Sequence, residues 1–289
     1  MRIGLLISGK LGLIILNHAI DKYLIDFVIT DAKSSEIVFK CEEKKIDTFI
    51  GNPRGGKCSN FINKRKIDVL ASVNYLYIIE KELIELPRLL AFNIHGSLLP
   101  KYRGRTPHVW AIINNELETG ITAHIINEEC DKGEIIEQIK IGIEYNDTGA
   151  DILKKFEGLY IPIFESVLEK VRENRLTKKV QNENSATFFG KRTSEDGLIN
   201  WNWQKERIRN WVRAQAKPYP GAFTFYNNQK LIIDKIGFSD KGFHSDMPNG
   251  LIIENNPNLY VKTPNGVVEL LEVRTNTINI EIGKCFKDE

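Results

Sequence analysis

The first half of the chain alternates short apolar runs with helix-like segments, and this alternation constrains the fold more than any other feature. Strands and helices at this spacing predict βαβ units and a mostly parallel, Rossmann-like sheet with helices on both faces. The expected strands are Ile3–Ile7, Ile25–Thr30, Ile46–Ile50, Ile67–Ser72, Leu89–Ile94, Ile121–Ile126 and Ile135–Ile143. The expected helices are Leu13–Lys22, Ser34–Lys45, Ser59–Lys66, Lys81–Leu86 and Gly149 to about Asn174, the last capped by Thr148.

The pattern changes after Lys178–Thr187, a polar stretch that reads as a linker. Beyond it come short strands separated by Asn-Asn, Pro-Asn and Pro-Asn-Gly turn signals, which predict a small β-rich, barrel-like or OB-like domain. We therefore expect a catalytic domain at residues 1–185 and a β-rich domain at 186–289. Its expected elements are the helix Gln204–Ala216 and the strands Ala222–Tyr226, Lys230–Ile236, Gly250–Glu254, Leu259–Thr263, Gly266–Val273 and Ile278–Ile282.

Composition restricts the class of protein. Of the 289 residues 42% are hydrophobic and 27% are charged, as in ordinary globular proteins. The net charge of +2 gives no electrostatic reason to expect nucleic acid or an anionic membrane as a partner. No apolar run is long enough to span a bilayer, and polar residues interrupt the apolar start of the chain, so we expect no signal peptide. The spacing of four cysteines suggests neither a zinc site nor a disulfide framework, which favours a cytoplasmic location.

Two familiar nucleotide-binding motifs are missing. The segment Gly4–Leu11 nearly matches a phosphate-binding P-loop, but its last position is Leu11 where a hydroxyl residue should ligate magnesium. We interpret it as a strand followed by a turn. The dinucleotide pattern of three spaced glycines is also absent after this strand, so we predict no nicotinamide site.

The most informative polar residues are Asn93 and His95, at the carboxyl end of a predicted strand. Residues two apart in a strand face the same side, and ligands of parallel sheets bind beyond this edge. A lone histidine here is often structural, but the shared face with Asn93 and the following Gly-Ser-Leu-Leu-Pro loop favour catalysis. Asp131 follows the next strand and is a stronger candidate if it partners His95, because a carboxylate there would orient the imidazole and raise the imidazole pKa. His124, inside that strand, reads as structural.

These motifs resemble a known family. The stretch Ala91–Gly104, with Gly120-Ile121-Thr122 and Asp131-Lys132-Gly133, resembles the formyltransferases that use N10-formyltetrahydrofolate. That family includes methionyl-tRNA formyltransferase, glycinamide ribonucleotide transformylase and the sugar-nucleotide N-formyltransferases. The second half looks like the second domain of these enzymes at Lys191-Arg192-Thr193, Asp196-Gly197, Ile199-Asn200-Trp201, Arg213-Ala214 and Pro218–Phe223. The segment Lys101–Pro107 suggests the sugar branch, which includes the formyltransferase half of the enzyme that modifies UDP-4-amino-4-deoxy-arabinose.

The resemblance implies roles for individual residues. Asn93, His95 and Asp131 match the catalytic trio, and no metal is required. Residues that match folate contacts are Tyr77, Ile78, Ile79, Arg105, Asn127, Glu128, Glu129 and Cys130. Lys132 departs from the small residue often seen beside the aspartate, which affects only the details of the folate loop. Acceptor contacts are predicted on the loop after His95, at Ser97, Lys101, Tyr102, Arg103, Thr106 and His108.

We therefore expect transfer of a formyl group from N10-formyltetrahydrofolate to the amine of a nucleotide-linked amino sugar, such as a dTDP-sugar used for O-antigen or capsule synthesis. Methionyl-tRNA formylation is the alternative, but residues 186–289 carry 14 Lys and Arg against 12 Asp and Glu, a weak basic footprint. A formyltetrahydrofolate hydrolase, which needs the same trio, stays open, whereas a non-enzymatic binding module is disfavoured because the whole trio is present. Trp201, Trp203 and Trp211 are expected at a packed seam between the domains, and they motivate the expectation of a homodimer.

Overall fold

The structure is a computed structural model that describes residues 1–274 and 279–287. The chain divides into two compact units. The first contains Met1–Pro107, Thr119–Ile141 and Lys155–Phe189, and the second contains His108–Glu118, Gly142–Lys154 and Gly190–Glu289. Both units thus draw on the middle of the chain, and the simple division at residue 185 stays a prediction from sequence.

A seven-stranded sheet forms the centre of the first unit, in the order β3-β2-β1-β4-β5-β7-β8. Its strands are β1 (Arg2–Ile7), β2 (Leu24–Thr30), β3 (Thr48–Ile50), β4 (Ile67–Val73), β5 (Pro87–His95), β7 (Glu118–Ile125) and β8 (Ile135–Gly142). The neighbours from β3 to β5 pair in parallel, and β7 runs antiparallel to β5. The expected mostly parallel sheet is confirmed.

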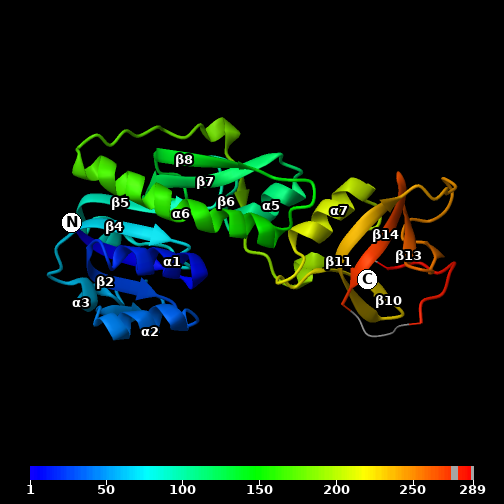
Figure 1. The fold of residues 1–289 in the computed structure, drawn as a ribbon, viewed down its shortest axis with the longest axis horizontal. Coiled ribbons are helices and arrows are strands. Elements are labelled where there is room, and N and C mark those ends of the chain that lie inside the picture. Colours follow the sequence, from blue (N-terminus) through cyan, green and yellow to red (C-terminus); the bar gives the residue numbers. More distant parts are fainter. Residues whose placement is uncertain (275–278, 288–289) are drawn as a thin grey trace. The chain divides into compact units, whose positions relative to one another are not determined.

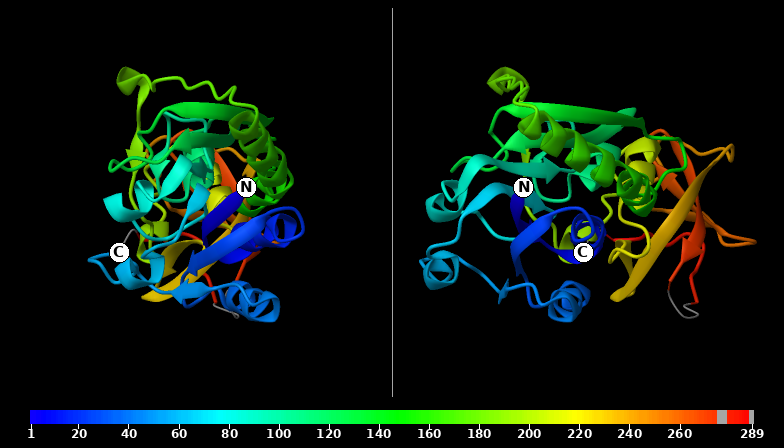
Figure 2. Two further views of the ribbon diagram at one scale, coloured as in Figure 1. Left: turned by 90° about the vertical axis from the view of Figure 1, so that its left-hand side faces the viewer. Right: turned by 60° about the vertical axis from the view of Figure 1, so that its left-hand side comes forward.

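Helices cover both faces of this sheet (Figures 1 and 2). They are α1 (Gly9–Ala19), α2 (Ser35–Lys44), α3 (Ser59–Ile62), α4 (Lys81–Ile84) and the part of α6 (Gly149–Arg172) that begins at Lys155. On one face, Phe164 of α6 packs against Phe92 of β5 and Tyr23 beyond α1. On the other, Ile62 of α3 and Leu83 of α4 share an apolar cluster with strand residues. Helix α3 is shorter than expected, because the sequence continues with Asn63 and a left-handed Lys64.

Helix α6 begins where the sequence predicts. The hydroxyl of Thr148 accepts from the main-chain N–H of Asp151 at 3.2 Å, and a carboxylate oxygen of Asp151 accepts from the N–H of Thr148 at 2.9 Å. This reciprocal pair is a capping box, so Thr148 is confirmed as the cap. The helix α5 (Pro107–Ile113) was not expected, although a proline at its first position is a common start signal.

The second unit contains a five-stranded antiparallel half-barrel sheet in the order β10-β11-β14-β13-β12. Its elements are α7 (Lys205–Ala214), β10 (Ala222–Tyr226), β11 (Gln229–Ser239), β12 (Ile252–Glu254), β13 (Leu259–Thr263) and β14 (Gly266–Val273). The β-rich class of this domain is confirmed. In the segment Ile278–Ile282, expected as a strand, the first residue lies outside the described residues and 279–282 are irregular.

The expected tryptophan seam between the domains is wrong for Trp201. This side chain is 1% exposed and lies in the apolar core of the second unit, stacked on Phe286 at 5.5 Å between ring centroids. Trp203 and Trp211 pack against the same core, with their rings 5.0 Å apart. The sequence shows the three indoles as near neighbours but not that one half-barrel could enclose them.

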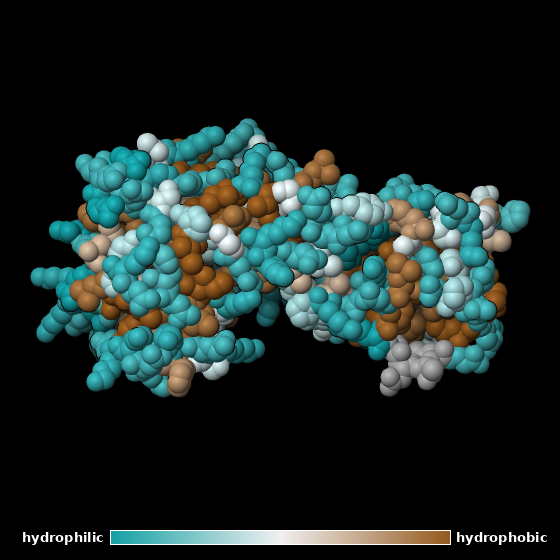
Figure 3. Space-filling model, viewed as in Figure 1, coloured by the Kyte–Doolittle hydropathy of each residue, from teal (hydrophilic) through white to brown (hydrophobic). Residues whose placement is uncertain are grey.

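Polar and apolar residues are unevenly distributed over the surface. On the face seen in Figure 3, charged and polar residues cover most of the first unit, while apolar residues show along its middle. Of the helices in residues 1–274 and 279–287, none is long and apolar enough to cross a membrane.

Candidate active site

Strand β5 delivers two polar side chains to one side of the sheet, Asn93 and His95. The strand ends at His95, and its parallel neighbour β4 ends at the same edge. On its other side, the antiparallel strand β7 places His124 opposite Asn93 and Thr122 opposite His95. The functional side chains thus stand at the carboxyl edge of the parallel sheet, where such folds bind ligands.

His95 is held by a main-chain oxygen. Its Nε2 lies 2.8 Å from the carbonyl oxygen of Tyr102, and its side chain is 8% exposed. A carbonyl oxygen can only accept, so Nε2 carries a proton in both charge states of the ring. Nδ1, the other nitrogen, faces a carboxylate oxygen of Asp131 at 3.6 Å. Nδ1 is therefore the atom at which His95 gains or loses a proton.

Asp131 lies in the loop between β7 and β8 and is fixed from two sides. Its carboxylate accepts from the main-chain N–H of Gly104 at 2.9 Å, and its main-chain oxygen accepts from the Gln181 amide at 2.8 Å. Burial alone would raise the pKa of this carboxyl group, but attraction to His95 and the hydrogen bond from the Gly104 N–H together hold the pKa well below its usual range. Asp131 is thus a charged partner for the imidazole.

The main chain around these groups is conformationally unusual. Tyr102, Thr106 and Asp131 have φ angles of 61°, 48° and 55°, and Gly104 has 99°. A Cβ atom on Gly104 would lie 2.2 Å from the carbonyl oxygen of Phe189, so only glycine fits there. Non-glycine residues in the left-handed region cost energy, and clusters of them occur at functional sites. Here they bring the Tyr102 oxygen and the Gly104 N–H to His95 and Asp131.

Three of the residues predicted to contact the formyl acceptor make contacts with other residues of the protein. The hydroxyl of Ser97 donates to the carbonyl oxygen of Lys101 at 2.7 Å, and the Tyr102 ring stacks on Phe189 at 5.3 Å. Arg103 is 3% exposed and donates to Gln181 and to the carboxylate of Glu183, the latter at 2.6 and 2.9 Å. These contacts shape the loop, and a direct role in acceptor binding stays a prediction.

The other predicted acceptor contacts differ in exposure. Lys101 is exposed, whereas the buried hydroxyl of Thr106 finds no hydrogen-bond partner among the described residues. His108 belongs to the second unit, where its Nε2 lies 2.8 Å from the hydroxyl of Tyr219. Burial lowers the pKa of His108 to about 4, so its ring is neutral near pH 7.

The residues that match folate contacts lie in two loops. In the first, Ile78 is exposed, Ile79 packs on the core, and the Tyr77 ring meets Tyr75 edge-on. Arg105 donates to the carbonyl oxygen of Leu76, next to this segment. The second loop consists of the exposed residues Asn127, Glu128, Glu129 and Cys130, directly before Asp131. Their roles in folate binding are predictions that the arrangement permits.

Sequence reasoning missed two residues of this site. Gln181 lies in the segment interpreted as a linker, and His124 was interpreted as structural. His124 lies 3.1 Å from the Asn93 amide nitrogen and 3.5 Å from an oxygen of Asp131. An antiparallel register that pairs Asn93 with His124 would have identified it, but the spacing alone cannot give a register.

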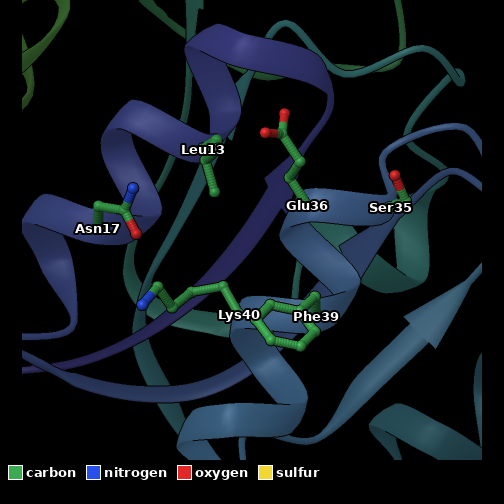
Figure 4. Close-up of a pocket in the computed structure, with 6 residues that line it drawn as sticks. All are labelled: Leu13, Asn17, Ser35, Glu36, Phe39 and Lys40. Atoms are coloured by element: carbon green, nitrogen blue, oxygen red, sulfur yellow. The ribbon is translucent and has the colours of Figure 1, made fainter.

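A separate open hollow of about 390 Å³ lies between α1 and α2 (Figure 4). It is lined by Leu13, Asn17, Ser35, Glu36, Phe39 and Lys40, none of which belongs to the site above. No group of three or more histidine, cysteine, aspartate or glutamate side chains that could hold a metal ion occurs in the described part of the chain.

An amide, an imidazole and a charged carboxylate at the edge of a parallel α/β sheet define an enzyme site for acyl-type group transfer. Comparison with known proteins gives the family. The Formyl transferase model matches residues 29–168, and the model of the formyl transferase C-terminal domain matches residues 191–284. The chain belongs to the formyl transferase family.

Individual relatives agree with this assignment. The chain is 34% identical over 258 residues to the bifunctional polymyxin resistance protein ArnA of Wigglesworthia glossinidia brevipalpis. That match covers 87% of this chain but only 39% of ArnA, so the chain spans about two fifths of that relative's length.

Solved structures share the fold. WlaRD, a sugar 3-N-formyl transferase crystallised with dTDP and 5-N-formyl-THF, has a TM-score of 0.74 at 21% identity, with 96% of this chain and 99% of that chain covered. The N-formyltransferase of Helicobacter canadensis, in complex with folinic acid and dTDP-3-aminofucose, has a TM-score of 0.74 at 20% identity, with 93% and 97% covered.

Proposed function

We propose that this enzyme transfers the formyl group of N10-formyltetrahydrofolate to the primary amine of a nucleotide-linked amino sugar. The observation that carries the proposal is the grouping of Asn93, His95 and Asp131 in a chain of the formyl transferase family. Folate compounds are named with WlaRD and the Helicobacter canadensis enzyme, which supports the choice of donor.

The reaction begins when the acceptor amine attacks the formyl carbon, which produces a tetrahedral intermediate with a developing oxyanion. The Asn93 amide and the protonated His95 donate hydrogen bonds to that oxygen. Donors that are already in place are typically worth about 3–4 kcal/mol each. Collapse of the intermediate releases tetrahydrofolate and leaves a formamide on the acceptor.

The His95 hydrogen bond to the oxyanion comes from Nδ1, because Nε2 donates to Tyr102 and keeps its proton. Asp131 faces Nδ1 at 3.6 Å and orients the ring. A ring that donates from Nδ1 has no lone pair there, so a bound water serves as the base for the amine and delivers the proton to N10 of the departing tetrahydrofolate. No step requires a metal.

The acceptor is assigned from two lines of support. Residues 186–289 have a weak basic footprint, which disfavours tRNA as the acceptor. Two relatives of similar length to this chain are named with dTDP or a dTDP-amino sugar. We further propose that the product enters surface polysaccharide synthesis such as that of O-antigen, and that the enzyme acts as a cytoplasmic homodimer. The four free cysteines are compatible with a reducing compartment.

A consumption assay with N10-formyltetrahydrofolate tests the proposal. Amino-sugar nucleotides and methionyl initiator tRNA are offered in parallel, with His95→Ala as the control. We expect formylation of a sugar nucleotide that His95→Ala abolishes. Formylated tRNA would replace the proposed acceptor, and tetrahydrofolate release without an acceptor would indicate a hydrolase. Light scattering at micromolar protein concentration tests the dimer, which a monomeric mass would contradict.

A further inference from the structure

His124 occupies a position from which it touches two members of the proposed trio. It lies in β7, opposite Asn93 in the antiparallel pairing, and is 3% exposed. Its Nε2 is 3.1 Å from Asn93 Nδ2 and 3.5 Å from Asp131 Oδ1. Its Nδ1 is 2.8 Å from the carbonyl oxygen of Ile125. Both ring nitrogens are therefore engaged within the site.

The partner of Nδ1 decides where the ring proton is. The Ile125 oxygen only accepts, so Nδ1 carries a hydrogen and donates it. In the neutral ring, Nε2 then has a lone pair and accepts from the Asn93 amide. This tautomer is fixed by the main chain of β7 and does not depend on any ligand.

A hydrogen-bond acceptor at Nε2 of His124 determines the orientation of the Asn93 side-chain amide. The NH2 group must face His124, because the amide oxygen would meet the ring lone pair there. One N–H of the amide is used on His124, and the second stays available to a reacting atom. A charged ring would present a second donor instead, and its Nε2–H would pair with Asp131, 3.5 Å away.

We propose that His124 is a positioning residue that orients the Asn93 amide so that it donates to the oxyanion. The inference rests on the proposed function, in which Asn93 provides one of two donors to the tetrahedral intermediate. His124 acts through Asn93 and needs no contact with either substrate. Its loss should therefore lower kcat and leave the KM of the amine acceptor nearly unchanged.

The kinetic test compares His124→Phe with His124→Gln, each alone and in the Asn93→Ala background. Phe keeps a planar ring without an acceptor, whereas the Gln carbonyl oxygen can accept from Asn93. We expect His124→Phe to lower kcat about 10- to 100-fold, which is less than the loss expected when an oxyanion donor is removed altogether. His124→Gln should restore most of this loss. In the Asn93→Ala background, His124→Phe should have no further effect beyond about threefold. Equal losses in both backgrounds, or a loss mainly in KM, would overturn the proposal.

A spectroscopic test on the wild-type protein is independent of activity. Nitrogen-15 NMR of the histidine rings in the wild-type protein separates the protonated nitrogen from the one with a lone pair. We expect His124 to show a protonated Nδ1 and an unprotonated Nε2 at pH 7.5, with the resonance assigned by its loss in His124→Gln. The opposite tautomer or a charged ring would overturn the proposal even if formylation is found. If no acceptor is formylated, the proposed function fails, while this spectrum still decides the geometry.

Discussion

The side-chain amide of Gln181 fixes the main chain of Asp131. Its Nε2 donates to the carbonyl oxygens of Asp131 and Gly133 at 2.8 and 2.7 Å. Its Oε1 accepts from Nε and Nη2 of Arg103 at 3.1 and 2.8 Å. Asp131 has a φ of 55°, an unfavourable conformation that the surrounding contacts must maintain. A residue far along the chain thus holds the carboxylate that faces His95.

Replacing Gln181 with Leu should disturb this arrangement. The substitution leaves two carbonyl oxygens without their donor and the Arg103 guanidinium with Glu183 alone, which should destabilise the fold by about 1–3 kcal/mol. Because Asp131 is then free to shift, we expect kcat to fall about 10- to 100-fold. Steady-state kinetics and urea unfolding measure the two effects.

Glu183→Gln is the matched control for Gln181→Leu. It removes the charge partner of Arg103 on the solvent side, where the carboxylate side chain is 61% exposed. Exposed ion pairs contribute little, so kcat should stay within about twofold. A loss as large as that of Gln181→Leu would mean that Arg103, rather than Gln181, controls the loop.

The sequence predicts the architecture well because periodicity reports burial directly. The strands Ala222–Tyr226, Leu259–Thr263 and Gly266–Val273 have the expected bounds, since each lies between clear turn signals. The helix Ser59–Ile62 and the irregular segment 279–282 differ from expectation, because apolar runs also occur where tertiary packing decides the backbone.

The site could be predicted only in part. Asn93 and His95 share a strand face, which spacing alone reveals. Gln181 and His124 join them through a strand register and a loop path that local sequence does not encode. Arg103 has a further role that the sequence does not show, since its guanidinium donates to Gln181 and Glu183, while its predicted contact with the substrate stays a prediction.

Gly133 should tolerate no side chain. A Cβ atom there would lie 1.8 Å from the carbonyl oxygen of Ile125, which is main chain and cannot move aside. Gly133→Ala must therefore displace the loop that carries Asp131, and we expect kcat to fall by at least about 10-fold.

Gly158→Ala is the control for Gly133→Ala. Gly158 is exposed in α6 with nothing within 4 Å of a new Cβ, so stability should rise by about 1 kcal/mol with kcat unchanged. Wild-type kinetics in Gly133→Ala would show that the loop adapts.

A fall of kcat/KM on the acid side of its pH profile, the acid limb, should not arise from Asp131. Although burial opposes ionisation, attraction to His95 and the hydrogen bond from the Gly104 N–H hold the Asp131 pKa well below its usual range. The carboxylate therefore stays charged from pH 5 to 8, and any limb in that window reports another group, which we expect to be an imidazole. Measuring kcat/KM against pH for the wild type and Asp131→Asn tests this. Asp131→Asn should lower kcat at every pH in the window, whereas a variant that loses activity only above a given pH would assign that limb to Asp131.

His108 should make the fold sensitive to mild acid. Burial lowers its pKa to about 4 from an ordinary value near 6.5, so between these values the unfolded chain binds a proton that the folded chain does not. Stability then falls as pH falls through this range, by about 2 kcal/mol between pH 7 and pH 5. The carboxyl groups of Asp31 and Asp234 also have lowered pKa values, but they affect stability only at lower pH, near and below their unfolded pKa of about 4.

Urea unfolding at pH 5 and pH 7 should show the loss of stability in the wild type and its absence in His108→Gln. Tyr219→Phe removes the hydroxyl beside Nε2 but not the titrating ring, so it should keep the dependence. An equal loss in His108→Gln would assign the acid sensitivity to another group.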